Sequence, residues 1–238
     1  MSDSAVESPP KVRMTRAEFR ATAYLAGVSG LRMLGLFIVL PVLALYAASL
    51  PGGGDPAMIG FAIGVYGLAQ AVLQIPFGWA SDRVGRKAAS AIGLVGFAGS
   101  FVAAWAPDIV WLAAGRTLQG AGAVSAVVMA LAADLTRDEV RTRAMAMIGI
   151  TIGATFAVSL VAGPVLGSTI GVPGIFVLTG RLAIAAIAVV QFGVPDPVAG
   201  ARGHEGAGER VALRRVLADP QLLRLDFGIF ALHAILMA

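Results

Sequence analysis

Six long apolar runs separated by short polar loops are the feature that most constrains the fold of this chain of 238 residues. An α-helix needs about 20 mainly apolar residues to cross the roughly 30 Å hydrocarbon core of a bilayer. Each run is about that long or longer. We therefore predict an all-α membrane protein with six spans, over residues 22–48, 57–80, 88–106, 109–133, 144–168 and 172–194.

Composition excludes the main alternatives to a membrane protein. Hydrophobic residues make up 58% of the chain and charged residues only 13%, whereas a soluble domain has about 25% charged residues. The apolar content excludes a disordered chain. The absence of Cys excludes a disulfide-stapled secreted domain and Cys-based metal sites. We predict no metal site, no cofactor and no catalytic residue.

The distribution of basic residues predicts the orientation. Of the 18 Lys and Arg residues, 15 lie on one side of the predicted bundle and three lie within spans, whereas loops 49–56, 107–108 and 169–171 contain none. The positive-inside rule places the basic side and the N-terminus in the cytoplasm. The isoelectric point of about 10.1 then follows from topology, and no nucleic-acid partner is expected.

Composition also divides the chain into four predicted regions. Residues 1–20 form a polar cytoplasmic tail without a cleavage site, and residues 21–194 form the six-helix bundle. Residues 195–221 form a cytoplasmic linker rich in Gly, Pro and charge, with a short amphipathic helix over 210–217. Residues 222–238 begin a seventh helix that is too short to cross the membrane. We therefore expect a truncated chain.

The turn between spans two and three carries the most specific motif, GWASDRVGRK at residues 78–87. Gly78 is expected to let another helix approach closely, and Gly85 to adopt the positive φ of a tight reversal. Asp82 lies at a membrane edge, where a carboxylate needs a partner such as Arg86. We interpret the motif as a conformational latch rather than a generic basic turn. Its residues are Gly78, Asp82, Arg83, Gly85, Arg86 and Lys87.

This stretch resembles the G-x-x-x-D-R-x-G-R-[RK] signature of the major facilitator superfamily. Residues 116–122, RTLQGAG, resemble the family motif R-x-x-Q-G-x-G, and residues 134–144 resemble its turn between spans four and five. The segments LRMLG, LPVL, YGL and QIPFG, which begin at residues 31, 40, 66 and 74, resemble YajR-type inner-membrane carriers within the superfamily. The resemblance implies the N-terminal six-helix half of a twelve-helix carrier, built as a 3+3 inverted repeat.

The resemblance also implies roles for two further motifs. The Asp and Arg of the turn motif map to Asp82 and Arg86, and a carboxylate at the inner end of span four maps to Asp134. The alternative is that Asp134 only caps span four. Residues 163–167, GPVLG, resemble the helix-bend core of an antiporter motif, with Gly163, Pro164 and Gly167. The match is incomplete, because Ser159 and Ser168 replace preferred glycines.

Polar residues within the spans are the candidates for a central cavity, because each is costly in lipid. Tyr66, Gln70 and Gln74 recur every four residues on span two, and Arg116 and Gln119 share a face of span four. The alternative is hydrogen bonding between helices without substrate contact. Arg181 receives no role. The cavity and coupling candidates are Arg32, Tyr66, Gln70, Gln74, Arg116, Gln119 and His233.

Proton coupling requires a group that titrates in the membrane. His233 is the only His within an apolar run, and its ordinary pKa near 6.5 suits a proton switch. The alternatives are that His233 only packs or makes hydrogen bonds, and that the coupling carboxylate lies in the missing half.

We predict a secondary active transporter of the bacterial inner membrane that works by alternating access and exports small molecules by proton-coupled antiport. The alternatives are a uniporter or importer of small solutes, including anions, and a channel. An enzyme is disfavoured because the spans lack a metalloprotease motif, a P-loop and a His–carboxylate constellation. A retinal protein needs a Lys in its last helix, and the only lysines are Lys11 and Lys87. The expected partners are the bilayer, a small-molecule substrate, protons and the missing C-terminal six-helix half.

Overall fold

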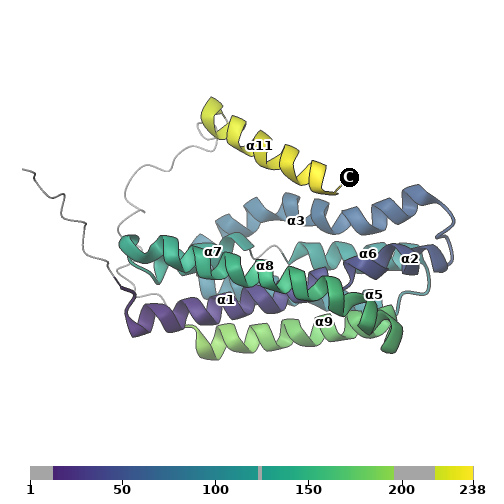
Figure 1. Ribbon diagram of the computed structural model, residues 1–238, viewed down its shortest axis with the longest axis horizontal. Coiled ribbons are helices and arrows are strands. Elements are labelled where there is room, and N and C mark those ends of the chain that lie inside the picture. The colour runs from purple at the N-terminus through teal and green to yellow at the C-terminus, as the bar shows by residue number, and fades with distance from the viewer. Residues whose placement is uncertain (1–12, 123–124, 196–217, 238) are drawn as a thin grey trace, which may run out of the picture. The chain divides into compact units, whose positions relative to one another are not determined.

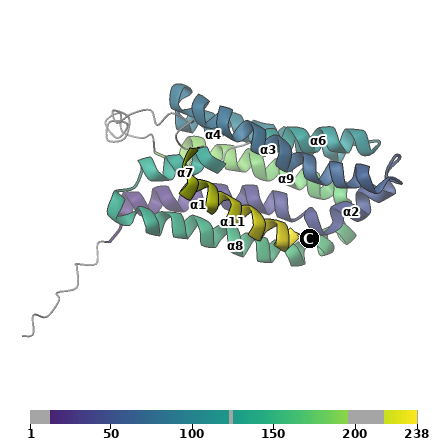
Figure 2. The same ribbon diagram turned by 90° about the horizontal axis from the view of Figure 1, so that it is seen from above.

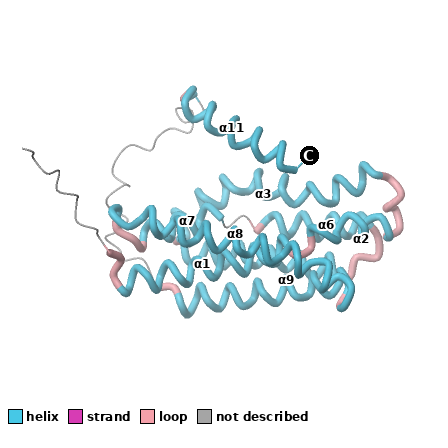
Figure 3. The backbone as a smooth tube through the Cα atoms, in the orientation of Figure 1, coloured by secondary structure: helices cyan, strands magenta, loops and turns pink. Residues whose placement is uncertain are grey.

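The computed structural model describes residues 13–122, 125–195 and 218–237. All regular elements within these ranges are helices (Figure 3). Within the described residues six segments are long and apolar enough to cross a membrane, in agreement with the predicted number of spans. They are Arg16–Ser49, Pro56–Ser81, Arg86–Ala104, Ile109–Asp134, Asp138–Thr169 and Gly171–Gly193.

The chain divides into two compact units, Met1–Pro197 and Val198–Ala238. The described part of the second unit is largely one helix, α11 (Pro220–Met237), which contains the predicted seventh apolar run. The predicted amphipathic helix over 210–217 lies outside the described residues. The side chains of Asp82 and His233 also lie outside the described part of the chain.

Three of the six spans are interrupted, a feature that the hydropathy pattern does not indicate. Only the second and fifth spans are each one uninterrupted α-helix, and the sixth closes with a π-helical turn. In chain order the elements of the first unit are α1 (Arg16–Phe37), α2 (Leu40–Ser49), α3 (Pro56–Val84), α4 (Arg86–Val95), η1 (Gly96–Ala98), α5 (Gly99–Ala104), α6 (Ile109–Ala121), α7 (Ser125–Asp134), α8 (Asp138–Thr169), α9 (Gly171–Ala188) and η2 (Val189–Gly193).

Glycine contacts accompany the interruptions of spans three and four. A Cβ added to Gly96 would collide with the backbone of Gly122, so the two spans touch backbone to backbone where both are interrupted. Span one is interrupted just before Pro41, which lies in the first turn of α2, a position that proline tolerates. By contrast, α3 and α8 continue through Pro76 and Pro164. Proline therefore does not by itself decide where a span breaks.

The packing of the first unit has the symmetry of an inverted repeat. Helix α1 packs along α8 as α6 packs along α3, and α1 packs on α9 as α6 packs on α5 (Figures 1 and 2). In a 3+3 repeat, spans one, two and three correspond to spans four, five and six. Under this correspondence each packing pair of the first repeat becomes the matching pair of the second. The predicted fold, the six-helix N-terminal bundle with a 3+3 repeat, accounts for this pattern.

The buried core consists of two apolar clusters at opposite ends of the bundle. We call the basic end the one where α1 begins, α3 passes into α4 and α7 passes into α8. The cluster nearer this end includes Leu25, Leu131 and Ile148, and the other includes Leu43 and Phe176. Only 17% of the apolar core of the second and fifth spans is buried, compared with 39–53% in the other four. Helices α3 and α8 therefore present the most open faces.

Candidate functional site

An ion pair joins the third and fourth spans at the basic end. Arg86 is the first residue of α4 and Asp134 the last residue of α7. The Arg86 Nε atom lies 2.5 Å from Asp134 Oδ2, with side chains 30% and 21% exposed. Arg86 and Asp134 are two of the three charged residues that the sequence resemblance joins in the latch, and the third is Asp82. The pair places Asp134 in contact with the start of the third span, in addition to its position at the end of α7.

The turn between α3 and α4 depends on Gly85. Its φ is +99°, a backbone conformation that other residues adopt only with strain, and its N–H donates to the Ser81 carbonyl at 3.0 Å. A Cβ added to Gly78 would meet no described atom within 4 Å, so the close helix approach that we expect at this position is not made within the described residues. Arg83 lies over the Trp79 ring, 3.7 Å from the centroid.

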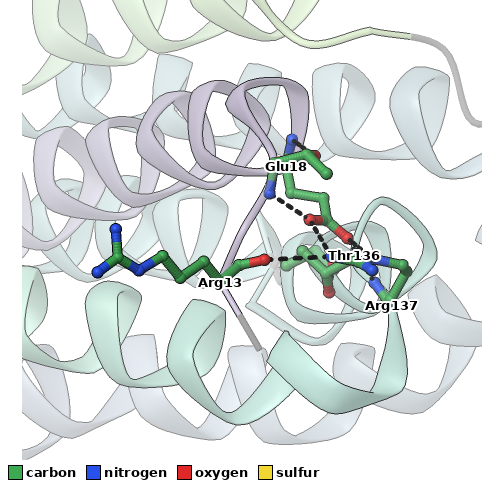
Figure 4. A network of polar contacts seen from close by, with 6 residues as sticks. Arg13, Glu18, Thr136 and Arg137 are labelled. Atoms are coloured by element: carbon green, nitrogen blue, oxygen red, sulfur yellow. Dashed lines mark hydrogen bonds and ion pairs between the residues drawn. The ribbon is translucent and has the colours of Figure 1, made fainter. Parts of the chain in front are cut away.

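A second polar network at the basic end was not predicted (Figure 4). Glu18, only 7% exposed, accepts hydrogen bonds from Arg137 Nε at 2.8 Å and from Arg137 Nη2 and the Arg137 backbone N–H at 3.2 Å. Arg137 Nη2 also donates to the Arg13 carbonyl at 3.2 Å. The Glu18 carboxylate raises the pKa of the Arg137 guanidinium. This Glu18–Arg137 clamp fixes the start of α1 against the turn between α7 and α8.

The sequence contained a signal for half of this clamp. Thr15 and Glu18 form a capping box, in which each side chain accepts from the other residue's backbone N–H. The Ser/Thr-x-x-Glu pattern before an apolar run is the known signature of that motif. The contact with Arg137, 119 residues away, depends on the fold and has no local signal. Because Arg137 is three residues from Asp134, the clamp and the Arg86–Asp134 pair hold the same turn.

Arg116 lies in the interior of the bundle and is 1% exposed. Its Nη1 atom donates to Gln119 Oε1 at 2.9 Å, and Gln119 Nε2 donates to Ser100 Oγ at 2.6 Å. The guanidinium lies over the Tyr66 ring, 4.7 Å from the centroid. The Nε atom of Arg116 is buried without a hydrogen-bond partner among the described residues. The structure thus brings together three of the predicted cavity residues and adds Ser100.

The other predicted cavity residues are arranged differently. Arg32, 4% exposed, donates from Nη1 to Ser125 Oγ at 2.5 Å, and its Nε and Nη2 atoms have no partner within the described chain. Gln70 and Gln74 are partly buried, and Gln74 Oε1 likewise lacks a described partner. The two serines that receive these networks were not predicted, because a lone Ser in a span carries no distinctive signal.

Glycines of the span-four motif serve close helix contacts. A Cβ added to Gly120 would collide with the carbonyl of Tyr66, and one added to Gly122 with the carbonyl of Gly93. Close approach at Gly120 is what brings the Tyr66 ring within reach of Arg116. The glycines of the predicted motif therefore position the polar residues beside them.

The predicted helix-bend motif packs against the break in span one. A Cβ added to Gly163 would meet the Ile38 carbonyl, and one added to Gly167 would meet Val42. At four other glycines an added Cβ would meet no described atom within 4 Å. They are Gly60, Gly64, Gly149 and Gly153. They lie on α3 and α8, the two least buried spans. In the described ranges no group of three or more His, Asp or Glu is placed to hold a metal ion.

Comparisons with known proteins agree with this architecture. Residues 25–238 match the family described as the Major Facilitator Superfamily. The inner membrane transport protein YajR of Escherichia coli (strain K12) is 47% identical over 227 residues, which cover 95% of this chain and 50% of that protein. A tetracycline resistance protein, class E, from Escherichia coli is 31% identical over 141 residues, which cover 58% of this chain and 34% of the relative.

A solved structure shows the same fold. The human organic anion transporter MFSD10 superposes with a TM-score of 0.65 at 21% identity, over 80% of this chain and 49% of that one. This chain spans about half the length of YajR. Because the family match covers most of the residues and the fold agrees, the chain belongs to the major facilitator superfamily and has the fold of its N-terminal six-helix half.

Proposed function

We propose that this chain forms the first half of a secondary active transporter of the bacterial inner membrane that moves small molecules by alternating access. A second six-helix half completes the central cavity, and residues 195–221 link the two halves. Membership of the family and a match to about half of YajR, an inner membrane transport protein, support this proposal. Transport then requires the full-length carrier and not the bundle alone.

The observation that carries the proposal is the pair of buried arginines. Arg32 and Arg116 are 4% and 1% exposed, and their described hydrogen-bond partners are Ser125 and Gln119, which are neutral. Buried charge is costly within a membrane, and it typically marks a substrate or ion pathway. A cavity between two halves would bring water or substrate to these groups. We assign Gln70 and Gln74 to the same cavity, because they follow Tyr66, which contacts Arg116, by one and two turns of α3.

We assign the Arg86–Asp134 pair to the latch that stabilises one state of the cycle. Gly78 and the open glycines of α3 and α8 would then contact the second half, because small residues permit close helix approach in lipid. The lack of close neighbours at these glycines among the described residues supports that assignment. Asp82, Arg83, Gly85 and Lys87 complete the latch on sequence grounds.

Proton-coupled export is the transport mode that we propose. Gly163 and Gly167 place the predicted antiporter motif directly against the break in span one, where a change in helix packing would alter the cavity. His233 in α11 is the candidate proton carrier of this chain. The likeness to a tetracycline resistance protein is compatible with export of an amphipathic molecule.

The basic end is proposed to lie in the cytoplasm. Because the chain has no Cys, single cysteines at Gly54 and Glu139, which are both exposed, test this directly. We expect a membrane-impermeant maleimide to label G54C in intact spheroplasts and E139C only after permeabilisation. Labelling in the opposite order would reverse the orientation without affecting the assignment as a carrier.

A second candidate function is transport of an organic anion. The two guanidinium groups face no carboxylate among their described partners, so an anionic substrate would supply the missing counter-charge. This candidate shares the cavity with the export proposal and differs in the substrate class and in the direction of transport.

The deciding experiment is a substrate screen on the full-length gene product in proteoliposomes with an imposed pH gradient. Saturable flux that depends on the gradient supports a proton-coupled carrier. Flux that neither saturates nor requires a gradient would instead identify a channel. R116K, which keeps the charge but not the guanidinium geometry, should reduce the saturable flux, whereas R16Q at the exposed start of α1 should not.

A further inference from the structure

A polar pocket at the basic end shares only Lys87 with the sites described above. It has a volume of about 290 Å³ and lies between the first turns of α1, the start of α4 and the end of the sixth span. It is therefore at the level where three membrane spans begin or end. The lining residues used below are Arg20, Tyr24, Lys87, Gln191, Phe192 and Gly193.

The local sequence of the sixth span builds one wall of this pocket. Residues Val189–Gly193 form a π-helical turn, in which the Val194 N–H donates to the Val189 carbonyl at 3.2 Å. Such turns are rare and occur frequently at functional sites. A Cβ added to Gly193 would lie 3.1 Å from the Tyr24 ring. The absence of a side chain at Gly193 therefore allows the tyrosine ring to pack directly against the helix backbone.

The chemistry of the lining is cationic on one side and apolar on the other. Arg20 and Lys87 supply two positive charges, and Gln191 and Tyr24 supply an amide and a hydroxyl. Among the described lining residues there is no Asp or Glu. Phe192 is 92% exposed, at the end of an apolar span. A phosphate group suits the cationic side, and hydrocarbon suits the exposed phenyl ring.

We propose that this pocket binds the headgroup of an anionic phospholipid, with its phosphate between Arg20 and Lys87 and its glycerol backbone beside Phe192. Basic pockets between membrane helices on the cytoplasmic side commonly hold such headgroups. The assignment to that leaflet rests on the proposed orientation. A lipid here contacts the starts of α1 and α4, and α4 begins with the latch residue Arg86.

Native mass spectrometry of the full chain in detergent tests the proposal by counting discrete lipid adducts. The probes are dioleoylphosphatidylglycerol, dioleoylphosphatidylcholine with the same acyl chains, and inorganic phosphate alone. We expect one phosphatidylglycerol adduct that R20Q weakens about fivefold, which is the effect of one basic residue near a lipid surface. The matched control R16Q removes the same charge one helical turn earlier, outside the pocket, and should leave the adduct unchanged.

The outcomes separate a site from general attraction. Equal loss in R16Q and R20Q, or equal binding of the two lipids, would overturn the proposal. F192A should weaken the lipid adduct, and inorganic phosphate that binds as well as the lipid would replace the lipid with a soluble anion. Arg20 and Phe192 are exposed, so their variants should fold, which circular dichroism can confirm. Because no transport is measured, failure here leaves the proposed carrier function untouched.

Discussion

The charged groups at the basic end differ from those in the interior of the bundle. At the basic end Arg86 pairs with Asp134 and Arg137 pairs with Glu18, so each of these two guanidinium groups has a carboxylate partner. In the interior Arg32 and Arg116 are more deeply buried, yet their described hydrogen bonds go to a hydroxyl and an amide. A bundle built only for stability would have the opposite arrangement, because uncompensated charge costs most where water is absent.

The difference indicates two kinds of role. Ion pairs at the end of the bundle hold segments that are far apart in sequence, and they stabilise the fold or one of its states. The described surroundings of the interior arginines provide no carboxylate to offset the cost of burying their charge. Sites adapted to function often reduce stability in this way. The comparison therefore predicts opposite effects of mutation on stability and on transport in the two regions.

The largest expected effect is on transport by R116M. Loss of the interior charge should lower saturable flux by the full-length carrier about 100-fold, a barrier change of about 2.7 kcal/mol. The thermal midpoint of the purified protein should not fall by more than about 2 °C, because removal of uncompensated buried charge offsets the loss of the Gln119 contact. Proteoliposome flux and thermal unfolding measure the two quantities. A large loss of stability with flux retained per folded molecule would make Arg116 a structural residue.

Disruption of the Arg86–Asp134 pair is expected to affect transport less and stability more. D134N removes the carboxylate charge and should reduce flux about tenfold while lowering the free energy of unfolding by about 1 kcal/mol, the upper range for a partly exposed pair. The double-mutant cycle with R86Q measures the coupling. Additive effects of the two substitutions would show that the ion pair contributes nothing, and Asp134 would then act only as a helix cap.

The Glu18–Arg137 clamp should affect stability alone. E18Q keeps the size of the side chain but removes its charge, and loss of charged hydrogen bonds to Arg137 should cost about 1–2 kcal/mol. Detergent unfolding followed by circular dichroism measures this free energy. E139Q, an exposed carboxylate two residues beyond Arg137, is the matched control and should cost less than about 0.5 kcal/mol. If the two variants lower the free energy of unfolding equally, the Glu18–Arg137 contact contributes no more than an ordinary surface charge.

Sequence alone predicted the six spans because hydrophobic length is a strong, local signal. It also paired Arg86 with Asp134 and Arg116 with Gln119, the first through a family resemblance and the second through helical spacing. It missed Ser100, Ser125 and Arg137, because their contacts join segments far apart in the chain.

The breaks in the spans were missed for a related reason. Every residue around Gly96 and Gly122 is apolar or small, so hydropathy predicts continuous helices there. Close backbone contact between the two spans accompanies both interruptions, and that contact exists only in the folded bundle. Pro76 and Pro164 are the opposite case. Proline is a local signal for a helix break, yet each of these residues lies within an unbroken helix.

The smallest expected effect concerns Arg83, a basic-end arginine whose described contact is an aromatic ring. Its guanidinium lies 3.7 Å from the centroid of the Trp79 ring, and a cation–π contact at an exposed site contributes about 0.5–1 kcal/mol. R83Q and W79L should each reduce the free energy of unfolding, and their double-mutant cycle should give a coupling in that range. Arg83 shares a neutral partner with the interior arginines but is exposed to solvent. A coupling near zero would show that burial, and not the type of partner, distinguishes the two regions.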